Sequence, residues 1–445
     1  MRRVVSPARI LAASLAGLVL VGTVLLSLPL AATTGALEPI DALFTAISAV
    51  CVTGLIVVDT AGDLSTFGQL VVLALIQAGG LGYMTLTTLV AVAIGRQLSV
   101  QERITLQEAL NIETMDGLVR FTFAVFKFTL AFELAGAVLL TLAWAGEMGV
   151  GRAAYFALFH AVSAFNNAGF ALFPDSLMRF RSDWLVNGVV MGLVMAGGVG
   201  FVVLSELRRW RRGVRLSVHA KLVLSMSALL IVGGTLFVFA LERDNPATLG
   251  GLPAGEAVLA ALFQAVTPRT AGFNTLDIGA MAPATLFGLM VLMFIGAAPG
   301  GTGGGVKVTT FGITVAALWA TVRGADEATI FRRRLQPALV ARAFFISLIA
   351  FLALNAVAAL LLVTEGRPLL ATLFETTSAF GTVGLSLGET GAPVSLAGHF
   401  SAAGKLLVAA MMFMGRIGPL TLAVAVAHRR TVARVRHPDG RFLVG

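Results

Sequence analysis

Long apolar runs alternate with shorter apolar runs along the whole chain. The long runs are residues 10–32, 70–95, 121–145, 184–207, 222–241, 285–322, 343–363 and 406–427. At about 1.5 Å of rise per residue, each can cross roughly 30 Å of hydrocarbon as a helix. The short runs lie near residues 40–50, 153–165, 257–266 and 370–380, a length typical of re-entrant or buried helices. The order predicts four units, each with a short helix between two transmembrane helices.

Each short run contains a copy of one motif that begins with phenylalanine. The copies are FTAISAVCVTGL from Phe44, FHAVSAFNNAGF from Phe159, FQAVTPRTAGFN from Phe263 and FETTSAFGTVGL from Phe374. A glycine follows the phenylalanine by ten, ten, nine and ten positions, at Gly54, Gly169, Gly272 and Gly384. Glycine-containing joints that only help helices to pack are the alternative. Four copies at nearly the same spacing indicate an internal repeat instead.

The second long run of each unit carries glycines of its own. They occur in AGGLGYMTL, AGGVGFVVL, GAAPGGTGGGVKV and MGRIGPLTL. We expect the four units to span residues 1–98, 99–215, 216–335 and 336–445. In this division the second unit starts with a cytosolic loop, the second helix of the third unit is broken, and the fourth unit ends in a basic cytosolic tail.

The composition is that of a polytopic membrane protein. The chain is 57% hydrophobic and 12% charged, and its mean hydropathy is +0.91, too apolar for a soluble protein of 445 residues. The single cysteine, Cys51, excludes an intrachain disulfide. The run at 10–32 exceeds the core of a signal peptide, which is about 7–15 residues, so we expect an uncleaved helix.

Basic residues outnumber acidic residues by 32 to 23, but their positions do not indicate nucleic-acid binding. They cluster between the apolar runs, in RRWRRGVR at 208–215 and FRRRL at 331–335, and near both ends of the chain. This distribution follows the positive-inside rule. We expect both termini to be cytoplasmic and the repeated loops to enter the membrane from the opposite side.

The repeated loops have the chemistry to bind a dehydrated cation. Non-helical backbone at membrane depth is tolerated only where it is buried in protein or lines a watery path. Loops that meet at one axis present a ring of carbonyl oxygens, which replaces the hydration shell of a permeating cation. Glycine removes the Cβ and permits the required backbone angles, and the C-terminal end of each short helix adds a negative dipole.

Over nearly the whole chain, these motifs resemble the Trk/Ktr/HKT superfamily of potassium transporters. Eight predicted spans make the chain most similar to the bacterial Ktr-type membrane pore subunit. The resemblance implies an all-α membrane protein of four helix–pore-helix–filter-loop–helix units in pseudo-fourfold symmetry around one ion pore. It also implies potassium selectivity, because glycine occupies the central position of every loop. The implied potassium-binding residues are Val52, Thr53, Gly54, Asn167, Ala168, Gly169, Thr270, Ala271, Gly272, Thr382, Val383 and Gly384.

The third loop departs from the other three. It is one residue shorter and contains Pro268 and Arg269. A cation that faced the filter would raise the barrier to permeation. We therefore expect Arg269 to brace the loop or to meet an acidic neighbour.

A glycine-rich break interrupts the long run at 285–322. Pro299 and six glycines between residues 296 and 305 are incompatible with a continuous transmembrane helix. The segment is not a phosphate-binding P-loop, because Val306 follows Gly305 where that motif requires lysine. The resemblance implies that this loop gates the pore below the filter; a passive kink is the alternative. The implied gate residues are Gly300, Gly301, Thr302, Gly303, Gly304, Gly305, Lys307 and Arg416.

Two ionisable residues inside predicted spans need partners there. For Arg416 we expect loop carbonyls or the hydroxyl of Thr302 as acceptors. Glu133 has three candidate roles, which are pairing with Lys127, holding a helix contact, or coupling sodium or protons to transport; a structural role is favoured. His160 has no second histidine or cysteine nearby, so we expect it to pack and not to bind a metal.

The expected function is potassium uptake across the bacterial inner membrane through a channel-like pore. Sodium- or proton-coupled symport through the same pore stays open. An enzyme is not expected, because the sequence has no HExxH-like pair and no exposed nucleophile with a base. An inverted-repeat transporter is disfavoured, because all four units run in the same direction.

The expected partners follow from the resemblance. It implies a homodimer that sits on a cytosolic ring of RCK-type nucleotide-binding subunits, so that ATP, ADP or NAD acts only through that partner. No cofactor besides transported potassium is expected in the chain itself. The candidate docking surfaces are the basic loops at 208–215 and 332–334, the segment 99–120 and the C-terminal tail. Contact of these basic segments with anionic lipid is the alternative.

Overall fold

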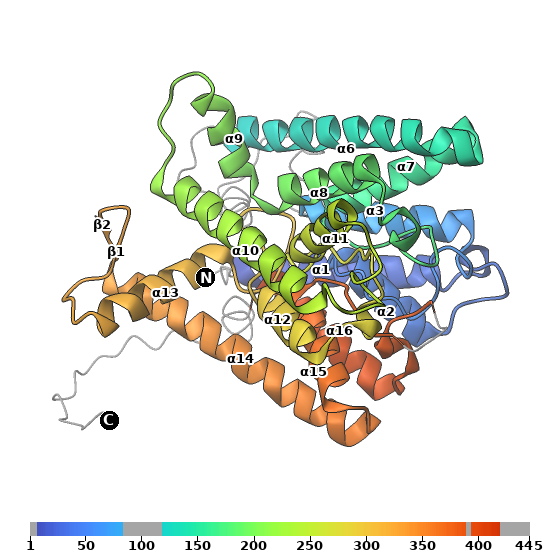
Figure 1. The fold of residues 1–445 in the computed structure, drawn as a ribbon. Coiled ribbons are helices and arrows are strands. Elements are labelled where there is room, and N and C mark those ends of the chain that lie inside the picture. Colours follow the sequence, from blue (N-terminus) through green and yellow to red (C-terminus); the bar gives the residue numbers. More distant parts are fainter. Residues whose placement is uncertain (1–6, 83–117, 389–392, 419–445) are drawn as a thin grey trace.

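A computed structural model of the chain describes residues 7–82, 118–388 and 393–418. The regular structure of this part is helical, apart from a hairpin of two short strands, β1 (Thr329–Ile330) and β2 (Arg333–Arg334) (Figure 1). The strands are antiparallel, with Thr329 opposite Arg334 and Ile330 opposite Arg333. The predicted all-α class is confirmed.

Four helices within the described residues are long and apolar enough to cross a membrane. They are α1 (Pro7–Leu26), α6 (Leu118–Met148), α10 (Val218–Glu242) and α14 (Pro337–Glu365). Large apolar side chains point outward from them, for example Leu142, Leu236 and Val363, which is 87% exposed. Apolar surfaces of this extent are compatible with lipid and not with water. The protein is therefore a multi-pass membrane protein.

Each long helix is followed by a short helix that ends inside the protein. The short helices are α2 (Pro39–Val50), α7 (Val150–Phe165), α11 (Ala254–Val266) and α15 (Leu369–Gly381). Proline fixes the start of three of them, since Pro39 is the first residue of α2 and Pro253 and Pro368 directly precede α11 and α15. The bounds agree with the four short apolar runs of the sequence.

A further helix follows each short one. These helices are α3 (Thr66–Leu81), α8 (Trp184–Gly198), α12 (Pro283–Phe294) and α16 (Ala402–Ile417). The side chains of Ser65, Asp183 and Ser401 accept backbone N–H groups and so cap three of them. Short 3-10 helices lie in the connecting segments, namely η1 (Pro29–Ala31), η2 (Met178–Phe180), η3 (Ile278–Ala280) and η4 (Leu396–His399).

These second helices are broken more often than the sequence predicts. The run 184–207 was expected to be one span, but α8 ends at Gly198 and α9 (Phe201–Trp210) continues at an angle of 103°. Gly200 has a φ of 93°, a left-handed conformation that ends a right-handed helix. Gly82 and Gly418, with φ of 79° and 91°, follow α3 and α16 in the same way. Residues 83–95 and 419–427 of those predicted spans lie outside the described residues.

The expected break in the third unit is present. It separates α12 from α13 (Val308–Val322) by the segment 295–307. Ile295 and Val306, at the two ends of this segment, form an isolated β-bridge, so the chain leaves and rejoins the helical direction at nearly the same place. The segment is thereby directed into the interior of the protein.

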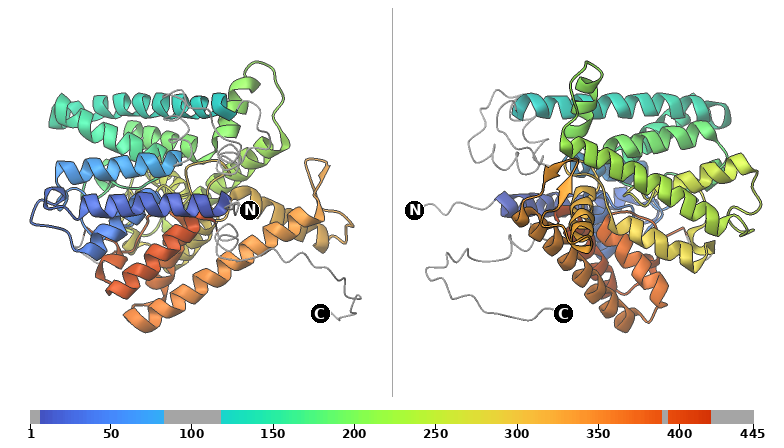
Figure 2. Two further views of the ribbon diagram at one scale, coloured as in Figure 1. Left: turned by 180° about the vertical axis from the view of Figure 1, so that it is seen from behind. Right: turned by 60° about the vertical axis from the view of Figure 1, so that its left-hand side comes forward.

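The apolar core joins each unit to the preceding one. Phe159 packs in a cluster with α2 and α3, Phe263 with α7 and α8, Phe374 with α10 and α12, and Phe44 with α15 and α16. The last of these clusters connects the first unit to the fourth. Figure 2 shows the two ends of the described chain, coloured blue and red, lying side by side. The core is therefore closed on itself.

An ion pair also joins α16 to the start of α2. The Nζ of Lys405 lies 2.6 Å from Oδ1 of Asp41, and the two side chains are only 11% and 16% exposed. Asp41→Asn or Lys405→Gln should lower the free energy of unfolding by about 1–3 kcal/mol, because each leaves a mostly buried charge without its partner. The apparent melting temperature of the full chain in detergent measures this loss.

The control for this prediction is the exposed pair Arg334–Glu327, whose side chains are 63% and 46% exposed. Glu327→Gln should change the melting temperature little, because exposed pairs contribute about 0–1 kcal/mol. The exchange of both charges, Asp41→Lys with Lys405→Asp, should recover part of the loss. A double variant as unstable as the sum of the single variants would show that the pair is not stabilising.

Candidate functional site

The loops that follow the short helices share one unusual backbone conformation. Val52, Asn167, Thr270 and Thr382 have positive φ, as do the glycines two positions later, Gly54, Gly169, Gly272 and Gly384. The residue between each pair does not. Alternation of left-handed and right-handed residues turns successive carbonyl groups to the same side of the chain. Positive φ costs about 1–3 kcal/mol at a non-glycine residue, so the surrounding structure must impose it.

The four loops contact one another in a closed ring through their glycines. A Cβ added at Gly54 would lie 2.4 Å from the carbonyl oxygen of Ala168, and one at Gly169 would lie 2.9 Å from that of Ala271. The corresponding distances are 2.3 Å from Gly272 to Val383 and 2.2 Å from Gly384 back to Thr53. No side chain fits at any of the four positions. The backbones of all four loops therefore meet at one place.

Carbonyl groups at this meeting point are left without hydrogen bonds. None of the described residues donates to the carbonyl oxygens of the eight residues that precede the glycines. They are Val52, Thr53, Asn167, Ala168, Thr270, Ala271, Thr382 and Val383, all buried. More than about 90% of buried backbone polar groups in proteins are paired. Eight unpaired carbonyls at one place are therefore a site for an external partner, and a carbonyl oxygen attracts a cation.

The loop amides, by contrast, are bonded to the short helices. The N–H groups of Gly54 and Gly384 donate to the hydroxyls of Ser48 and Ser378, both at 3.1 Å. The amide of Ala168 donates to the carbonyl of Ser163 at 2.8 Å. Because the donors point back into the protein, the acceptors are presented at the centre.

Glycines of the second helices make room for this arrangement. A Cβ at Gly79 would lie 2.0 Å from the carbonyl oxygen of Val50, and a Cβ at Gly197 would lie 1.8 Å from that of Phe165. The same contact at Gly415 is with Phe380, at 1.9 Å. These glycines therefore explain the motifs AGGLG, AGGVG and MGRIG.

The third loop is held differently. Arg269 is 7% exposed, and its Nη1 has no hydrogen-bond partner among the described residues. The acidic neighbour considered from the sequence is not found in the described part of the chain, where Arg269 forms no ion pair. The amide of Asn167 hydrogen-bonds with the hydroxyl of Thr270 at 3.0 Å, which ties the second loop to the third.

The glycine-rich segment lies against the third and fourth of these glycine loops. The amide of Gly304 donates to the hydroxyl of Thr382 at 3.0 Å, and a Cβ at Gly303 would lie 2.0 Å from the hydroxyl of Thr270. The amides of Thr302 and Gly305 donate to Gly197 and Gly415. The segment thus contacts the second, third and fourth units, and residues 302–306 are buried.

Arg416 connects this segment to the first unit. Its guanidinium donates to the carbonyl oxygens of Thr302 and Gly79, and to that of Gly80 at 3.4 Å. Lys307 donates to the carbonyl of Gly303 at 2.7 Å. The sequence suggested the loop carbonyls as acceptors, and the structure brings them to Arg416. The sequence did not suggest the carbonyl oxygens of Gly79 and Gly80 in α3.

Glu133 contacts Asn166, the residue at the start of the second glycine loop. Its carboxylate accepts from Asn166 at 2.9 Å and from Gln77 at 3.3 Å. Lys127 is exposed and forms no ion pair with it in the described part. The contact therefore joins three elements of two units. Asn166 and Gln77 were not identified from the sequence, because a polar residue beside the loop motif carries no signal of its partner.

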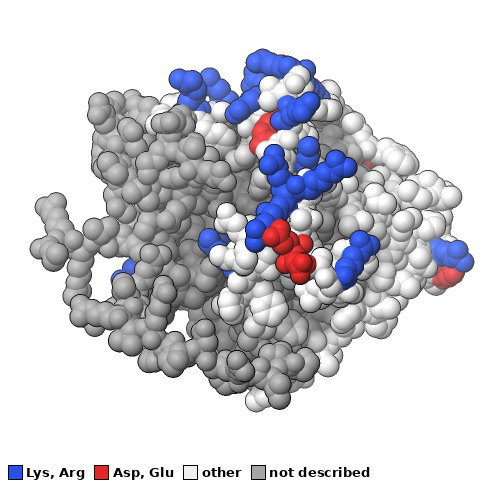
Figure 3. Space-filling view, turned by 90° about the vertical axis from the view of Figure 1, so that its left-hand side faces the viewer, with Lys and Arg blue, Asp and Glu red and all other residues white. Residues whose placement is uncertain are grey.

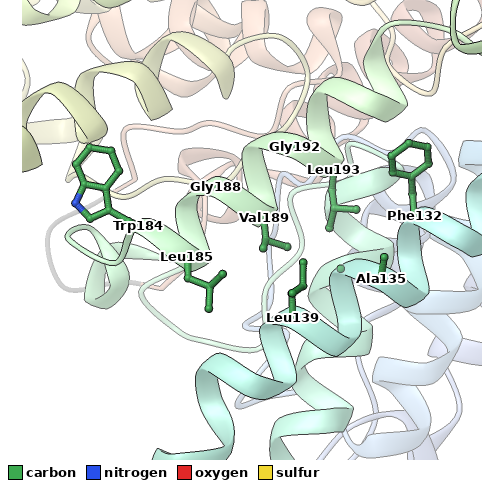
Figure 4. Close-up of a pocket in the computed structure, with 10 residues that line it drawn as sticks. Phe132, Ala135, Leu139, Trp184, Leu185, Gly188, Val189, Gly192 and Leu193 are labelled. Carbon is green, nitrogen blue, oxygen red and sulfur yellow. The ribbon is translucent and has the colours of Figure 1, made fainter. Parts of the chain in front are cut away.

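A separate apolar groove of about 380 Å³ lies between α6 and α8. Figure 4 shows Leu139 of α6 and Leu185, Val189 and Leu193 of α8 at its walls. Trp184 at its edge is 61% exposed. The groove is on the outer, lipid-compatible surface and none of its lining residues belongs to the four loops, so we assign it no part in the site.

Known proteins with this fold and sequence are cation transporters. The family model described as "TrkH: Cation transport protein" matches residues 17–433. The Ktr system potassium uptake protein B of Bacillus subtilis is 42% identical over 99% of this chain and 97% of its own. The potassium/sodium uptake protein NtpJ of Enterococcus hirae is 37% identical over 100% and 98%. The chain belongs to the TrkH cation transport protein family, whose members are transporters and not enzymes.

A solved structure shares the fold. The potassium transporter TrkH from Vibrio parahaemolyticus superposes with a TM-score of 0.75 at 19% identity, over 96% of this chain and 86% of the other. The Ktr system potassium uptake protein B of Vibrio alginolyticus, at 40% identity over 98% of this chain and 94% of its own, is a further relative in sequence.

The contacts of Arg416 lead to a testable expectation. Arg416→Ala removes every donor to the carbonyl of Thr302 and should loosen the glycine-rich segment. Hydrogen exchange of the amides of Thr302, Gly304 and Gly305 should then accelerate by roughly tenfold or more. Arg323→Ala, which removes an exposed arginine stacked on Trp319, is the control and should leave this exchange unchanged. Unchanged protection in a folded Arg416→Ala protein would mean that the guanidinium does not hold the segment.

Proposed function

We propose that this chain is the pore-forming membrane subunit of a potassium uptake system, with the four glycine loops as its selectivity filter. The observation that carries the proposal is the closed ring of loops with eight unpaired carbonyl oxygens. Carbonyl oxygens replace the water shell of a potassium ion without adding a full charge that would trap it. The bound potassium is the transported ion and not a cofactor.

The surroundings of the ring favour a cation. Four short helices end at the loops, and each directs the negative end of its dipole toward the carbonyls. The membrane potential contributes about 2.3 kcal/mol per charge per 100 mV, which drives uptake without a coupled ion. The names of the Ktr relatives, "potassium uptake protein", support the same ion.

We propose that the four units, residues 1–98, 99–215, 216–335 and 336–445, surround the pore in pseudo-fourfold symmetry. The glycine contacts, which pass from each loop to the next and back to the first, support this arrangement. The four first helices and the four short helices recur in the same order. Residues of the first, second and fourth units that lie outside the described part are included in the proposal from the sequence alone.

A second candidate is symport of potassium with sodium or protons through the same pore. The observation that favours it is the name of the Enterococcus hirae relative, a potassium/sodium uptake protein. Glu133, a buried carboxylate that contacts the second loop through Asn166, is a candidate coupling residue for this hypothesis.

We propose that the chain lies in the bacterial inner membrane with its termini and basic loops in the cytoplasm. Lys and Arg side chains gather on the side of the molecule where α9 ends and the β1–β2 hairpin projects (Figure 3). The exposed residues of this basic face include Arg208, Arg209, Arg211, Arg212, Arg332, Arg333 and Arg334. The positive-inside rule assigns such a face to the cytoplasm.

The same basic face is a candidate docking surface for partners. We propose that two copies of the chain form a dimer on a ring of RCK-type subunits, which bind ATP, ADP or NAD and regulate the pore. The support is the similarity to membrane subunits named for the Ktr system. Segment 99–120 and the C-terminal tail belong to the same proposal and lie almost entirely outside the described residues.

The glycine-rich segment is the proposed gate. It lies against the hydroxyls of Thr270 and Thr382, which belong to the filter loops, and Arg416 fixes it to the first unit. A backbone of six glycines between residues 296 and 305 can move at small steric cost once the guanidinium releases it. In this proposal, Gly300 to Gly305 and Lys307 move, and Arg416 holds them in place when the gate is closed.

Replacement of a filter glycine tests the proposed function. In proteoliposomes of the purified chain, potassium and rubidium should move in preference to sodium. Gly54→Ser and Gly384→Ser should reduce that preference by about tenfold or more, because each adds a Cβ within 2.4 Å or less of a neighbouring carbonyl oxygen at positive φ. Gly35→Ser, at a loop glycine of positive φ with open space around its Cβ, is the matched control.

If no potassium flux is observed, two explanations are possible, and a measurement of potassium binding distinguishes them. If the gate is closed without its partner, potassium should still raise the melting temperature more than sodium, since a bound ligand stabilises the folded state. If potassium neither moves nor stabilises the protein, the filter assignment is wrong. Dependence of potassium flux on sodium would favour the symport candidate.

Removal of the Arg416 side chain tests the proposed gate. Arg416→Ala should raise potassium flux by roughly tenfold at unchanged selectivity, since the loss of one charged hydrogen bond is about 1.5–3 kcal/mol. Deletion of Gly303 and Gly304 should do the same by shortening the obstruction. Arg323→Ala again serves as the control. Arg323 lies at the end of α13, the helix that follows the segment, and stacks on Trp319. Unaltered flux in both Arg416→Ala and the deletion of Gly303 and Gly304 would show that the segment is a passive kink.

A further inference from the structure

The residue after each motif phenylalanine faces the chain that leaves the filter. These residues are Thr45, His160, Gln264 and Glu375. They are buried and chemically different from one another. For His160, Gln264 and Glu375, a hydrogen-bond partner lies two or three positions after the filter glycine of the same unit. One position of the repeat therefore determines what stands behind each loop.

The second and third units each make one such bond. Nδ1 of His160 donates to the carbonyl oxygen of Phe156 at 2.7 Å. The unprotonated Nε2 of this neutral ring accepts the amide N–H of Leu172 at 3.3 Å. Nε2 of Gln264 donates to the hydroxyl of Thr275 at 3.2 Å. Both bonds are single and long, so these two loops are braced weakly.

The fourth unit makes a short and complete network. Glu375 is fully buried, and its carboxylate accepts the hydroxyl of Ser386 at 2.6 Å and the amide of Ala397 at 2.9 Å. The hydroxyl of Ser386 in turn accepts the amides of Gly388 and Leu396 at 3.1 and 2.8 Å. A hydroxyl has one proton and two lone pairs, so every position of Ser386 is used.

In the first unit this position of the repeat makes no such hydrogen bond among the described residues, although Ser48 holds the amide of Gly54. The hydroxyl of Thr45 is without a partner among the described residues. Instead, Ile56, two positions after Gly54, exchanges two hydrogen bonds with Ser395 of the fourth unit, at 3.0 and 2.9 Å. Ser395 is two residues from Ala397, which Glu375 holds. The carboxylate therefore stands behind two of the four loops.

We propose that Glu375 is a positioning residue of the filter, which sets the carbonyl geometry of the fourth loop through Ser386 and of the first loop through the segment 395–397. This inference rests on the proposed function of the four loops as a filter. Glu375 does not touch the ion, because its oxygens are engaged by Ser386 and Ala397. Its contribution is to cation selectivity and not to transport as such.

The network distinguishes a carboxylate from an amide of the same shape. In Glu375→Gln, the new NH₂ group faces either the amide of Ala397, which is itself a donor, or Ser386, whose lone pairs are already taken. Either orientation places two donors against each other. The substitution should therefore disturb the two loops although it adds no volume.

The test measures the ratio of potassium to sodium flux in proteoliposomes of the full chain. Glu375→Gln should lower this ratio by roughly tenfold. Because both fluxes come from the same vesicles, the ratio does not depend on how much protein is folded. Ser386→Ala and Ser395→Ala, which keep Glu375 but cut its links to the fourth and the first loop, should each produce a smaller fall.

The matched control is Glu242→Gln. Glu242 is also buried and accepts four hydrogen bonds, against two for Glu375; its donors are Thr285, Thr248, Asn245 and the amide of Ala282, none of which belongs to a filter loop. It should lower the melting temperature and leave the flux ratio unchanged. If the parent chain is selective and the flux ratio is unchanged in Glu375→Gln and in both serine variants, the inference about Glu375 is overturned. The proposed filter would still stand in that case. A parent chain without selectivity would instead overturn the proposed function.

Discussion

Eight buried carbonyl oxygens that receive no hydrogen bond from the described residues are the constraint on which this structure depends. Unpaired polar groups in an apolar interior cost free energy, so a protein keeps them only where surrounding contacts enforce the conformation. Here the enforcement is distributed. The short helices hold the loop amides, positive-φ residues turn the carbonyls to one side, and glycines of the second helices let backbones approach to distances that exclude any Cβ.

Much of this arrangement could be predicted from the letters, because its causes are local. The lengths of the apolar runs predicted the four short helices to within three residues and the four long helices to within about six. The register of the motif identified the glycines of positive φ, since only glycine tolerates that conformation beside another backbone. The glycine-rich break was visible because Pro299 cannot continue a helix.

Tertiary contacts were beyond the sequence. Nothing local to AGGVG distinguishes a glycine that permits close packing, such as Gly197, from one that ends the helix, such as Gly200. The partners of Arg416 and Glu133 come from other units, and Glu375 drew no notice because a glutamate in a pore helix has no motif of its own. Arg416 and Glu133 bind across units, which a single sequence does not record, and Glu375 binds residues 11 and 22 positions further along its own unit.

The closure of the ring has a consequence for biosynthesis. Asp41 and Lys405 are 364 positions apart, and the bonds between Ile56 and Ser395 span 339. Domains begin to fold while the chain is still being made, from the N-terminus onward. Ser48 holds the amide of Gly54 within the first unit, but Ile56 obtains its two hydrogen bonds only when Ser395 of the fourth unit has been made. A nascent chain that stops before the fourth unit therefore lacks the partner of Ile56 and the glycine contact that closes the ring of loops.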